Sequence, residues 1–235
     1  GRIPIMDSIS TKSGTTAPGT RDALIVKPDA RNEDLLRLRE DVDVLTLPGT
    51  ETARYVSGFA VSKRAIERAL QLRYEVFNVE MGEGLVSSSI AGLDRDPFDD
   101  QMTHLVVLEK ATGRVVGTYR LQTVRQGLAA AGLYSDQEYD LSSLSPWFDE
   151  AVECGRACIA KEHRSLTPLF LLWKGIAAFV RRYEQRWLFG CCSLTTTDPD
   201  DGWRAMKTIR ARGCLHPTLS LQAREDYCCG PAERE

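Results

Sequence analysis

The chain has no long apolar run and no basic-then-apolar leader pattern. A helix that spans a bilayer needs about 20 consecutive, mostly apolar residues, and no stretch of the 235 residues approaches that length. The missing leader pattern argues against secretion. We therefore expect a chain that works in the cytoplasm.

Cysteine spacing excludes two common scaffolds. The seven cysteines are odd in number and form no CxxC pair. This argues against a disulfide framework and against a zinc ribbon. Reduced thiols of a cytosolic protein are the simplest interpretation. We expect neither a metal site nor a bound cofactor.

Charge and composition are those of an ordinary globular protein. Hydrophobic residues make up 43% and charged residues 27% of the chain, and the formal net charge is -3. A chain with a pI near 5.8 lacks the basic surplus of a nucleic-acid binder. The length fits one large domain or one domain with appendages.

Composition changes near the N-terminus. Residues 1–20 are rich in Ser, Thr and Gly, which predicts a flexible tail. Residues 21–50 are mixed and weakly helical, and residues 47–50 (LPGT) predict a turn or linker. We therefore divide the chain into an N-terminal extension, residues 1–50, and one domain, residues 51–235.

Hydrophobic periodicity then alternates between strand and helix patterns. Short β-rich runs predict strands over residues 56–62, 104–109, 114–121, 151–160 and 186–194. Helical patterns cover residues 63–81, 166–183 and 199–212; Asp198 caps the last of these and Gly213 stops it. This order predicts an α/β fold in which helices cover both faces of a central mixed sheet.

The run 151–160 (AVECGRACIA) places two charges inside an apolar strand. Such charges are costly to bury unless they are paired or used. Glu153 and Arg156 lie three residues apart, so a regular strand would point them to opposite faces. Gly155 lies between them, and a glycine in a strand often marks a bulge. We predict a bulge at Gly155 that brings both charges to one face.

Two other charged features allow two interpretations each. Arg73 falls on the apolar stripe of the helix 63–81, between Leu70 and Phe77. It either snorkels at the edge of the stripe or points inward to serve a pocket. The acidic run 94–100 (DRDPFDD) lacks the glycine and the alternation of a calcium loop. Most such runs are solvated surface turns.

Several segments, in one order over roughly residues 56–200, resemble the Gcn5-related N-acetyltransferase (GNAT) superfamily. They most resemble its acyl-carrier-protein-dependent branch, which holds ornithine N-acyltransferases, N-acyl amino acid synthases and acyl-homoserine-lactone synthases. The segments are LRYEVF (72–77), DPFD (96–99), THLVV (103–107), VGTYRL (116–121), ECGRAC (153–158), LWKGIA (172–177) and FGCCSL (189–194).

The resemblance implies a GNAT-like central sheet with a bulged or splayed strand and a charged acceptor side. Matched position by position, the implied acceptor-side residues are Arg73, Asp96, Asp99, Arg120, Glu153 and Arg156. We expect Phe77 to join Arg73, Asp96, Asp99 and Arg120 in binding the substrate. We expect Ser193 to join Glu153 and Arg156 as a catalytic residue. Glu153 would take a proton from the attacking amine, directly or through water. Backbone amides near residues 155–157 would stabilise the oxyanion, and Ser193 would protonate the leaving thiolate.

The turn before the helix 166–183 departs from the usual GNAT pattern. Ordinary GNAT enzymes place a glycine-rich turn there, whose amides hold the pyrophosphate of coenzyme A. Here the stretch is HRSLTP (163–168), without glycine. This favours acyl-phosphopantetheine on acyl carrier protein as the donor, with its single phosphodiester. Arg164, Ser165 and Thr167 would meet that phosphate.

The implied reaction transfers a long-chain acyl group, with or without a 3-hydroxyl, from acyl carrier protein to the α-amine of an amino acid. Ornithine is the favoured acceptor; glycine, lysine and tyrosine stay open. So do an acyl-homoserine-lactone synthase and a non-catalytic module that binds a carrier protein. A cysteine nucleophile ranks low, because an amine attacks a thioester without covalent help. The amphiphilic product adds the expectation of transient contact with the inner membrane.

Overall fold

The computed structural model describes residues 2–4, 43–84, 92–194, 196 and 198–228. The predicted flexible tail and weak helix fall mostly on residues 5–42, outside these ranges. Residues Arg2–Pro4 form a short strand, β1.

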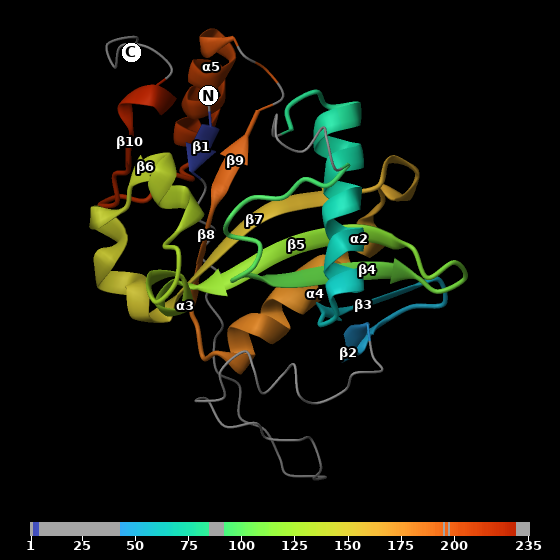
Figure 1. Cartoon of the computed structure of the whole chain (residues 1–235). Coiled ribbons are helices and arrows are strands. Elements are labelled where there is room, and N and C mark those ends of the chain that lie inside the picture. Colours follow the sequence, from blue (N-terminus) through green and yellow to red (C-terminus); the bar gives the residue numbers. More distant parts are fainter. Residues whose placement is uncertain (1, 5–42, 85–91, 195, 197, 229–235) are drawn as a thin grey trace.

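Six strands form the central sheet in the order β2-β3-β4-β5-β7-β8 (Figure 1). They are β2 (Val44–Glu51), β3 (Tyr55–Ala60), β4 (Thr103–Glu109), β5 (Val115–Thr123), β7 (Ala151–Ile159) and β8 (Trp187–Phe189). Neighbours from β2 to β7 are antiparallel, and β8 runs parallel to β7. The predicted mixed sheet is therefore confirmed.

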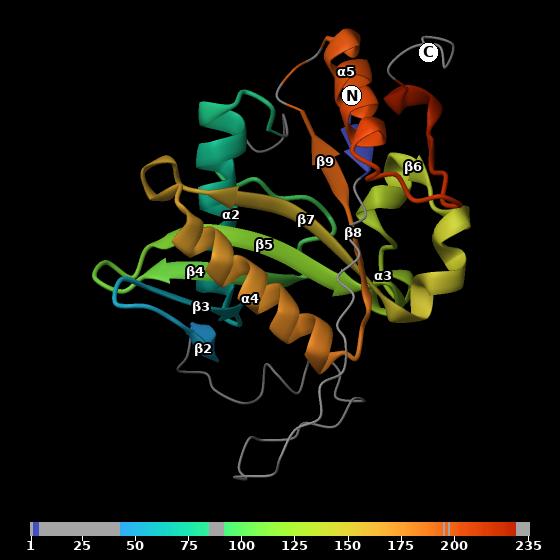
Figure 2. The same ribbon diagram turned by 180° about the vertical axis from the view of Figure 1, so that it is seen from behind.

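One long helix covers each face of this sheet. Helix α2 (Lys63–Arg73) lies on the face in front in Figure 1, and α4 (Leu166–Arg182) lies on the opposite face, in front in Figure 2. Gly175 lets α4 approach β4 closely, because a Cβ there would lie 2.3 Å from the Leu105 side chain. The apolar faces of both helices and the sheet share one hydrophobic core.

The helix predicted over 63–81 changes type halfway. After Arg73 the chain forms a π-helix, η1 (Tyr74–Glu80), and the Met81 amide donates to the Val76 carbonyl at 3.0 Å. Runs of π-helix are rare and often accompany functional sites. The wider turn carries Phe77 to the wall of a cleft.

Most of the remaining elements pack around the β8 edge of the sheet, while η5 (Lys161–His163) lies at the far end of β7, where His163 Nδ1 is 3.0 Å from Tyr55 Oη. The others are α3 (Val124–Leu128), η3 (Tyr134–Gln137), β6 (Tyr139–Asp140), η4 (Ser142–Glu150), β9 (Cys191–Ser193), α5 (Pro199–Ala211), β10 (Gln222–Ala223) and η6 (Glu225–Tyr227). Strand β9 pairs with β1, and β10 pairs with β6. The Asp198 cap and the stop at Gly213, whose φ is 68°, confirm the predicted last helix.

Two boundary predictions are wrong. The linker predicted at residues 47–50 belongs to β2, which crosses the predicted division at residue 50. Register shifts there and Gly49 has a φ of 71°; an edge strand tolerates Pro and Gly in such an irregularity. The strand predicted over 186–194 breaks at Gly190 into β8 and β9, which join different sheets.

Candidate functional site

Strand β7 carries the predicted bulge, one residue later than expected. Arg120 of β5 faces Gly155 and Thr118 faces Cys158, so two residues, Arg156 and Ala157, oppose Tyr119 alone. Arg156 has a φ of 51°, which costs a non-glycine residue about 1–2 kcal/mol. The bulge therefore rests on a strained arginine, while Gly155 has no such conformation.

Contacts of the Arg156 side chain accompany this strain. Its guanidinium lies over the Phe77 ring, 5.3 Å from the centroid, and its Nε lies 3.5 Å from Asp94 Oδ1. Glu153 and Arg156 both lie on the face of β7 that α2 covers, because Glu153 pairs across to Gln122 and Arg156 reaches Asp94. The predicted convergence on one face is confirmed.

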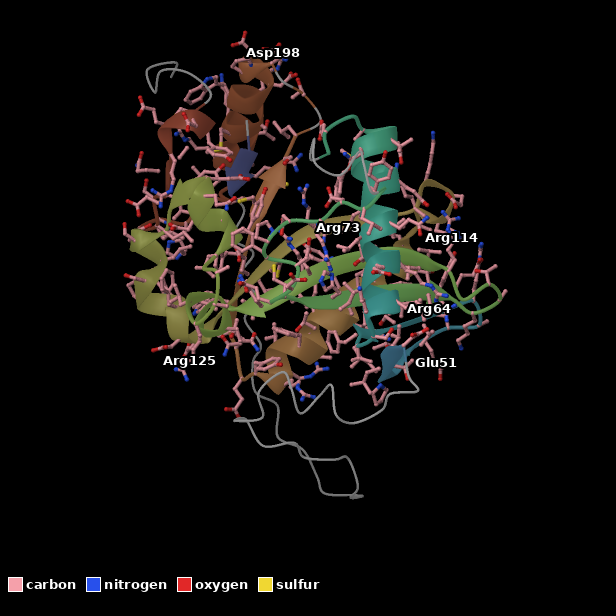
Figure 3. All side chains as sticks on the ribbon, viewed as in Figure 1. Glu51, Arg64, Arg73, Arg114, Arg125 and Asp198 are labelled. Carbon is pink, nitrogen blue, oxygen red and sulfur yellow. The ribbon has the colours of Figure 1, made fainter. Side chains whose placement is uncertain are left out.

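Arg73 is the centre of a buried ion network (Figure 3). It is 1% exposed. Its Nε and Nη2 donate to Asp94 Oδ1 at 2.9 and 2.6 Å, and its Nη1 and Nη2 donate to the Asp99 carboxylate at 2.5 and 3.1 Å. The inward interpretation of Arg73 is confirmed. The solvated-turn interpretation of the acidic run is wrong for Asp94 and Asp99, which are buried.

Arg120 extends the network toward the cleft. Its Nη1 donates to Asp96 Oδ1 at 2.7 Å and to Asp99 Oδ1 at 3.0 Å, and its guanidinium lies 5.1 Å from the centre of the Tyr134 ring. Arginine and aspartate thus alternate from Arg73 through Asp99 and Arg120 to Asp96. The arrangement fixes Arg120 at the polar end of the cleft.

The network sets the charge of its members. Burial would raise the pKa of Asp99, but hydrogen bonds from Arg73 and the charges of Arg73 and Arg120 outweigh it and lower that pKa to about 2. Burial lowers the pKa of His104, whose Nε2 lies 3.0 Å from the Asp99 carbonyl oxygen. Asp99 is therefore ionised and His104 neutral near pH 7.

Glu153 is buried behind the cleft and does not line it. Its carboxylate accepts hydrogen bonds from Gln122 Nε2 at 2.7 Å and from the amides of Tyr134 and Ser135 at 3.2 and 2.6 Å. These bonds fix the start of η3, which places Tyr134 in the cleft wall. Glu153 therefore does not border the space that a substrate would occupy. Its role as a base that acts through water stays a prediction.

The cleft opens where β7 and β8 separate. They pair only over Ala151–Glu153 and Trp187–Phe189, after which β9 turns away to β1. Within the described part of the chain, the rest of this edge of β7 has no strand partner. Gly190 sits at the branch point, where a Cβ would lie 2.1 Å from the Cys154 carbonyl oxygen. Only glycine fits there without moving the backbone.

The resulting cleft holds about 600 Å³ and has two unlike ends. Its polar part is lined by Glu83, Tyr119, Arg120, Tyr134 and Arg156, and its apolar part by Leu169, Leu172, Trp173, Ile176 and Leu188. The exposed residue Ala157 and Ser193 also border it. Such a cavity suits a ligand with a long apolar chain and a polar reacting group.

The predicted phosphate-binding residues lie at the start of α4. Arg164 borders the cleft, while Ser165 and Thr167 do not. Arg164 Nη1 and Nη2 donate to the two carboxylate oxygens of Glu80, each at 2.7 Å. Ser165 occupies the cap position without a capping side-chain hydrogen bond. Their role toward phosphate stays a prediction, and an anion would compete with Glu80 for Arg164.

Four cysteines line the same cleft: Cys154, Cys158, Cys191 and Cys192. Burial raises the pKa of the Cys154 thiol and raises those of Cys158 and Cys191 to about 12. Neutral thiols are poor nucleophiles. This supports the low rank given to Cys154, Cys158 and Cys191 as catalytic nucleophiles. Cys192 is exposed.

A second cavity of about 450 Å³ lies between the start of α2 and the end of α4. Phe59, Phe179 and Tyr183 line it, and Asp99 borders it. Because Arg120 borders the cleft, the ion network lies between the two cavities.

Sequence reasoning missed three residues of the site. Asp94, the first residue of the acidic run, is the ion-pair partner of both Arg73 and Arg156. Its position directly after apolar residues is the one sequence feature that could have marked it as buried. Tyr134 and Glu83 line the cleft from segments without a motif, so nothing in the sequence marks them.

Comparison with known proteins gives a family match. Residues 72–174 match the family model described as "Acetyltransferase (GNAT) domain". This stretch contains α2's last turn, the ion network, the bulge and the first half of α4.

Three curated relatives carry the name L-ornithine N(alpha)-acyltransferase. The protein of Brucella abortus (strain 2308) is 38% identical over 57% of this chain and 51% of its own length. That of Agrobacterium fabrum is 30% identical over 67% of this chain and 60% of its own length, and that of Rhodobacter capsulatus 33% identical over 61% and 58%. The chain thus spans little more than half the length of these relatives.

Among solved structures, the AHL synthase LasI aligns with 59% of this chain and 72% of its own. The sequence identity is 15% and the TM-score 0.43.

Proposed function

We propose that this chain, whose residues 72–174 match the model of the GNAT acetyltransferase domain, transfers a long-chain acyl group from a phosphopantetheine thioester to the α-amine of ornithine. The observation that carries the proposal is the cleft between β7 and β8–β9, with a charged end at the bulge and an apolar body. Relatives named as ornithine acyltransferases, 30–38% identical, support the acceptor.

The apolar body of the cleft is the proposed place of the acyl chain, along Leu172, Ile176 and Leu188. The pantetheine arm would enter past Arg164, at the positive end of the 17-residue helix α4. The turn before α4 has no glycine to cradle a pyrophosphate. A carrier protein, which presents one phosphodiester, is therefore the proposed donor.

The charged end of the cleft is the proposed place of ornithine. Arg156 borders it and has only one ion-pair contact within 4 Å, at 3.5 Å, among the described residues, so its guanidinium is available to hold the α-carboxylate. Glu83, exposed on the same wall, would accept the δ-ammonium. Asp96 and Asp99 already serve Arg120 and Arg73, so they position arginines instead of meeting the substrate.

The chemistry is an addition followed by elimination. The neutral amine nitrogen attacks the thioester carbonyl carbon, and N–H groups on the unpaired edge of β7 near residues 155–157 stabilise the oxyanion. The C–S bond then breaks as the amide forms. The proton lost by nitrogen would pass through water toward Glu153. Ser193 would relay a proton from water to the thiolate, taking up one as it gives one.

The test is acyl transfer by the purified chain with acyl-carrier-protein and, separately, acyl-coenzyme A as donor. Ornithine, glycine, lysine and tyrosine are offered as acceptors, and products are identified by mass spectrometry. We expect N-acylornithine from the carrier-protein donor. Equal rates with coenzyme A would remove the carrier protein from the proposal, and no amide with any acceptor would leave a non-catalytic binding module.

Glu153→Gln tests the relay within the same assay. The amide retains one oxygen as an acceptor but cannot take up a proton as a carboxylate does. We expect kcat to fall by about 100-fold, within the usual range of general base catalysis. Glu67 lies on α2, away from the cleft lining, with a side chain that is 44% exposed. It gives the matched control Glu67→Gln, which should leave kcat unchanged. Undiminished turnover of Glu153→Gln would leave Glu153 a purely structural role.

A further inference from the structure

Helix α4 exposes a row of large apolar side chains. Leu166 is 82% exposed, Phe170 63%, Leu169 43% and Trp173 37%. Their spacing of three and four residues puts them on one side of the helix. The opposite side is already buried in the core through residues such as Leu171 and Phe179. A contiguous exposed apolar row of this kind marks an interaction surface.

Charge on the helix complements an anionic surface. The sequence of α4, LTPLFLLWKGIAAFVRR, contains Lys174, Arg181 and Arg182 and no acidic residue. Lys174 Nζ lies 5.3 Å from the centre of the Phe170 ring, so positive charge adjoins the apolar row. A basic amphipathic helix with Trp, Phe and Leu on its apolar side is typical of segments that lie in a membrane interface.

The row is continuous with the cleft. Leu169 and Trp173 belong to the row and also line the cleft. Figure 2 shows α4 across the front of the sheet, with no other described helix or strand over it. No described helix is long and apolar enough to cross a membrane, which leaves contact along the surface as the geometry that this helix can make.

We propose that the exposed row of α4 (Leu166, Leu169, Phe170 and Trp173) docks on an anionic lipid bilayer, with Lys174 and Arg181 at its headgroups. Resting on the proposed function, this would let an acyl amino acid pass from the cleft into the leaflet without crossing water. An acidic carrier protein is the other candidate occupant of this row, and the test below separates it from the bilayer.

The test is co-sedimentation of the chain with vesicles of phosphatidylcholine alone or with about one third phosphatidylglycerol. We expect binding to the anionic vesicles. The double variant Leu166→Ser/Phe170→Ser should weaken it by about 100-fold, because each apolar side chain withdrawn from the interface is worth at least about tenfold. Lys174→Gln/Arg181→Gln should weaken it several-fold on anionic vesicles and change nothing on phosphatidylcholine.

The matched control is Leu128→Ser, which removes a side chain that is 59% exposed at the end of α3. It should bind vesicles as the unchanged chain does. Equal vesicle binding by the Leu166→Ser/Phe170→Ser variant would overturn the proposal. A second result would also overturn it: the same variant binds vesicles normally but has a higher KM for acyl-carrier-protein in the absence of vesicles. That result would assign the row to the carrier protein.

Vesicle binding requires no turnover, so the two proposals fail separately. A chain that binds anionic vesicles through this row but acylates no amine would contradict the proposed function alone. A chain that forms N-acylornithine and ignores vesicles would contradict only the docking of α4.

Discussion

The two walls of the cleft are stabilised by different physics. The β7 wall is backed by the ion network of Arg73, whose partners are buried, and by antiparallel pairing along β5. On the other wall, β8 pairs with β7 over three residues and β9 pairs with β1 over three residues. The neighbouring helix α5 has no buried residue. The β7 wall is therefore held by many buried contacts, and the β8–β9 wall by few.

The difference assigns a task to each wall. Strain such as the left-handed Arg156 persists only where surrounding contacts over-determine the backbone, and on the β7 side the buried ion network supplies such contacts. Regions with few buried apolar contacts open at lower free energy. We therefore expect the β7 wall to orient the reacting groups and the β8–β9 wall to yield when a thioester enters.

The largest effect should come from removing the centre of the network. Arg73→Met leaves Asp94 and Asp99 buried without their main cation, which we expect to cost about 3–5 kcal/mol of unfolding free energy. Arg114→Met is the control, since Arg114 pairs with Glu75 and Glu162 at the exposed surface and should cost less than about 1 kcal/mol. Urea unfolding compares the two, and equal losses would contradict a special role for the buried network.

Arg156 separates function from stability on the same wall. Arg156→Gly relieves the positive φ while removing the guanidinium at the cleft, so unfolding free energy should stay within about 1 kcal/mol. Loss of one bidentate carboxylate contact should lower kcat/KM for ornithine about 100-fold, or about 3 kcal/mol. A variant with full activity would show that the cleft binds its acceptor elsewhere.

Acid should weaken the β7 wall in a defined window. Asp99 has a pKa of about 2, against 3.8 for the unperturbed group. The folded state therefore binds fewer protons than the unfolded state, and the stabilisation is complete above about pH 4 and lost as pH falls through 2. The integrated effect is about 2 kcal/mol. The unfolding free energy of the unchanged chain should therefore fall between pH 5 and pH 2, and in Asp99→Asn this part of the fall should be missing. The same pH dependence in both proteins would contradict the prediction.

The smallest expected effect concerns the two glycines beside the cleft. Gly190→Ala places a Cβ against the Cys154 carbonyl and should cost about 1–3 kcal/mol through overpacking, while lowering acyl transfer as the walls shift. Gly155→Ala meets Arg120 Nε only at 3.7 Å and should be tolerated. Thermal unfolding of the two variants shows which one loses more stability. A larger loss in Gly155→Ala would place the essential glycine at the bulge.

Local signals predicted the elements that depend on neighbours in sequence. The cap of α5 at Asp198 and its stop at Gly213, with a φ of 68°, lie where sequence chemistry places them. The π-helix did not follow from sequence, because seven residues are too few to separate its period from that of an α-helix. The break at Gly190 depends on how closely β8 approaches β7, which is a tertiary property.

The site divides in the same way. Arg73, Glu153 and Arg156 were visible because charge in an apolar run is costly. The position of the bulge was not visible, since the contacts that accompany the left-handed Arg156 come from Asp94 and Phe77, which are distant in sequence. Burial of the acidic run likewise required Arg73, 21 residues away from Asp94.

The most direct test of the account locates the thioester in the cleft. Cys192 is exposed and lines it, while Cys214 and Cys228 are exposed elsewhere. Alkylation of each thiol is followed by peptide mass spectrometry, with and without a saturating, non-hydrolysable acyl-pantetheine donor. The account predicts that the donor slows alkylation of Cys192 at least about tenfold and leaves Cys214 and Cys228 unchanged. Equal alkylation of Cys192 with and without bound donor would contradict the cleft as the thioester site.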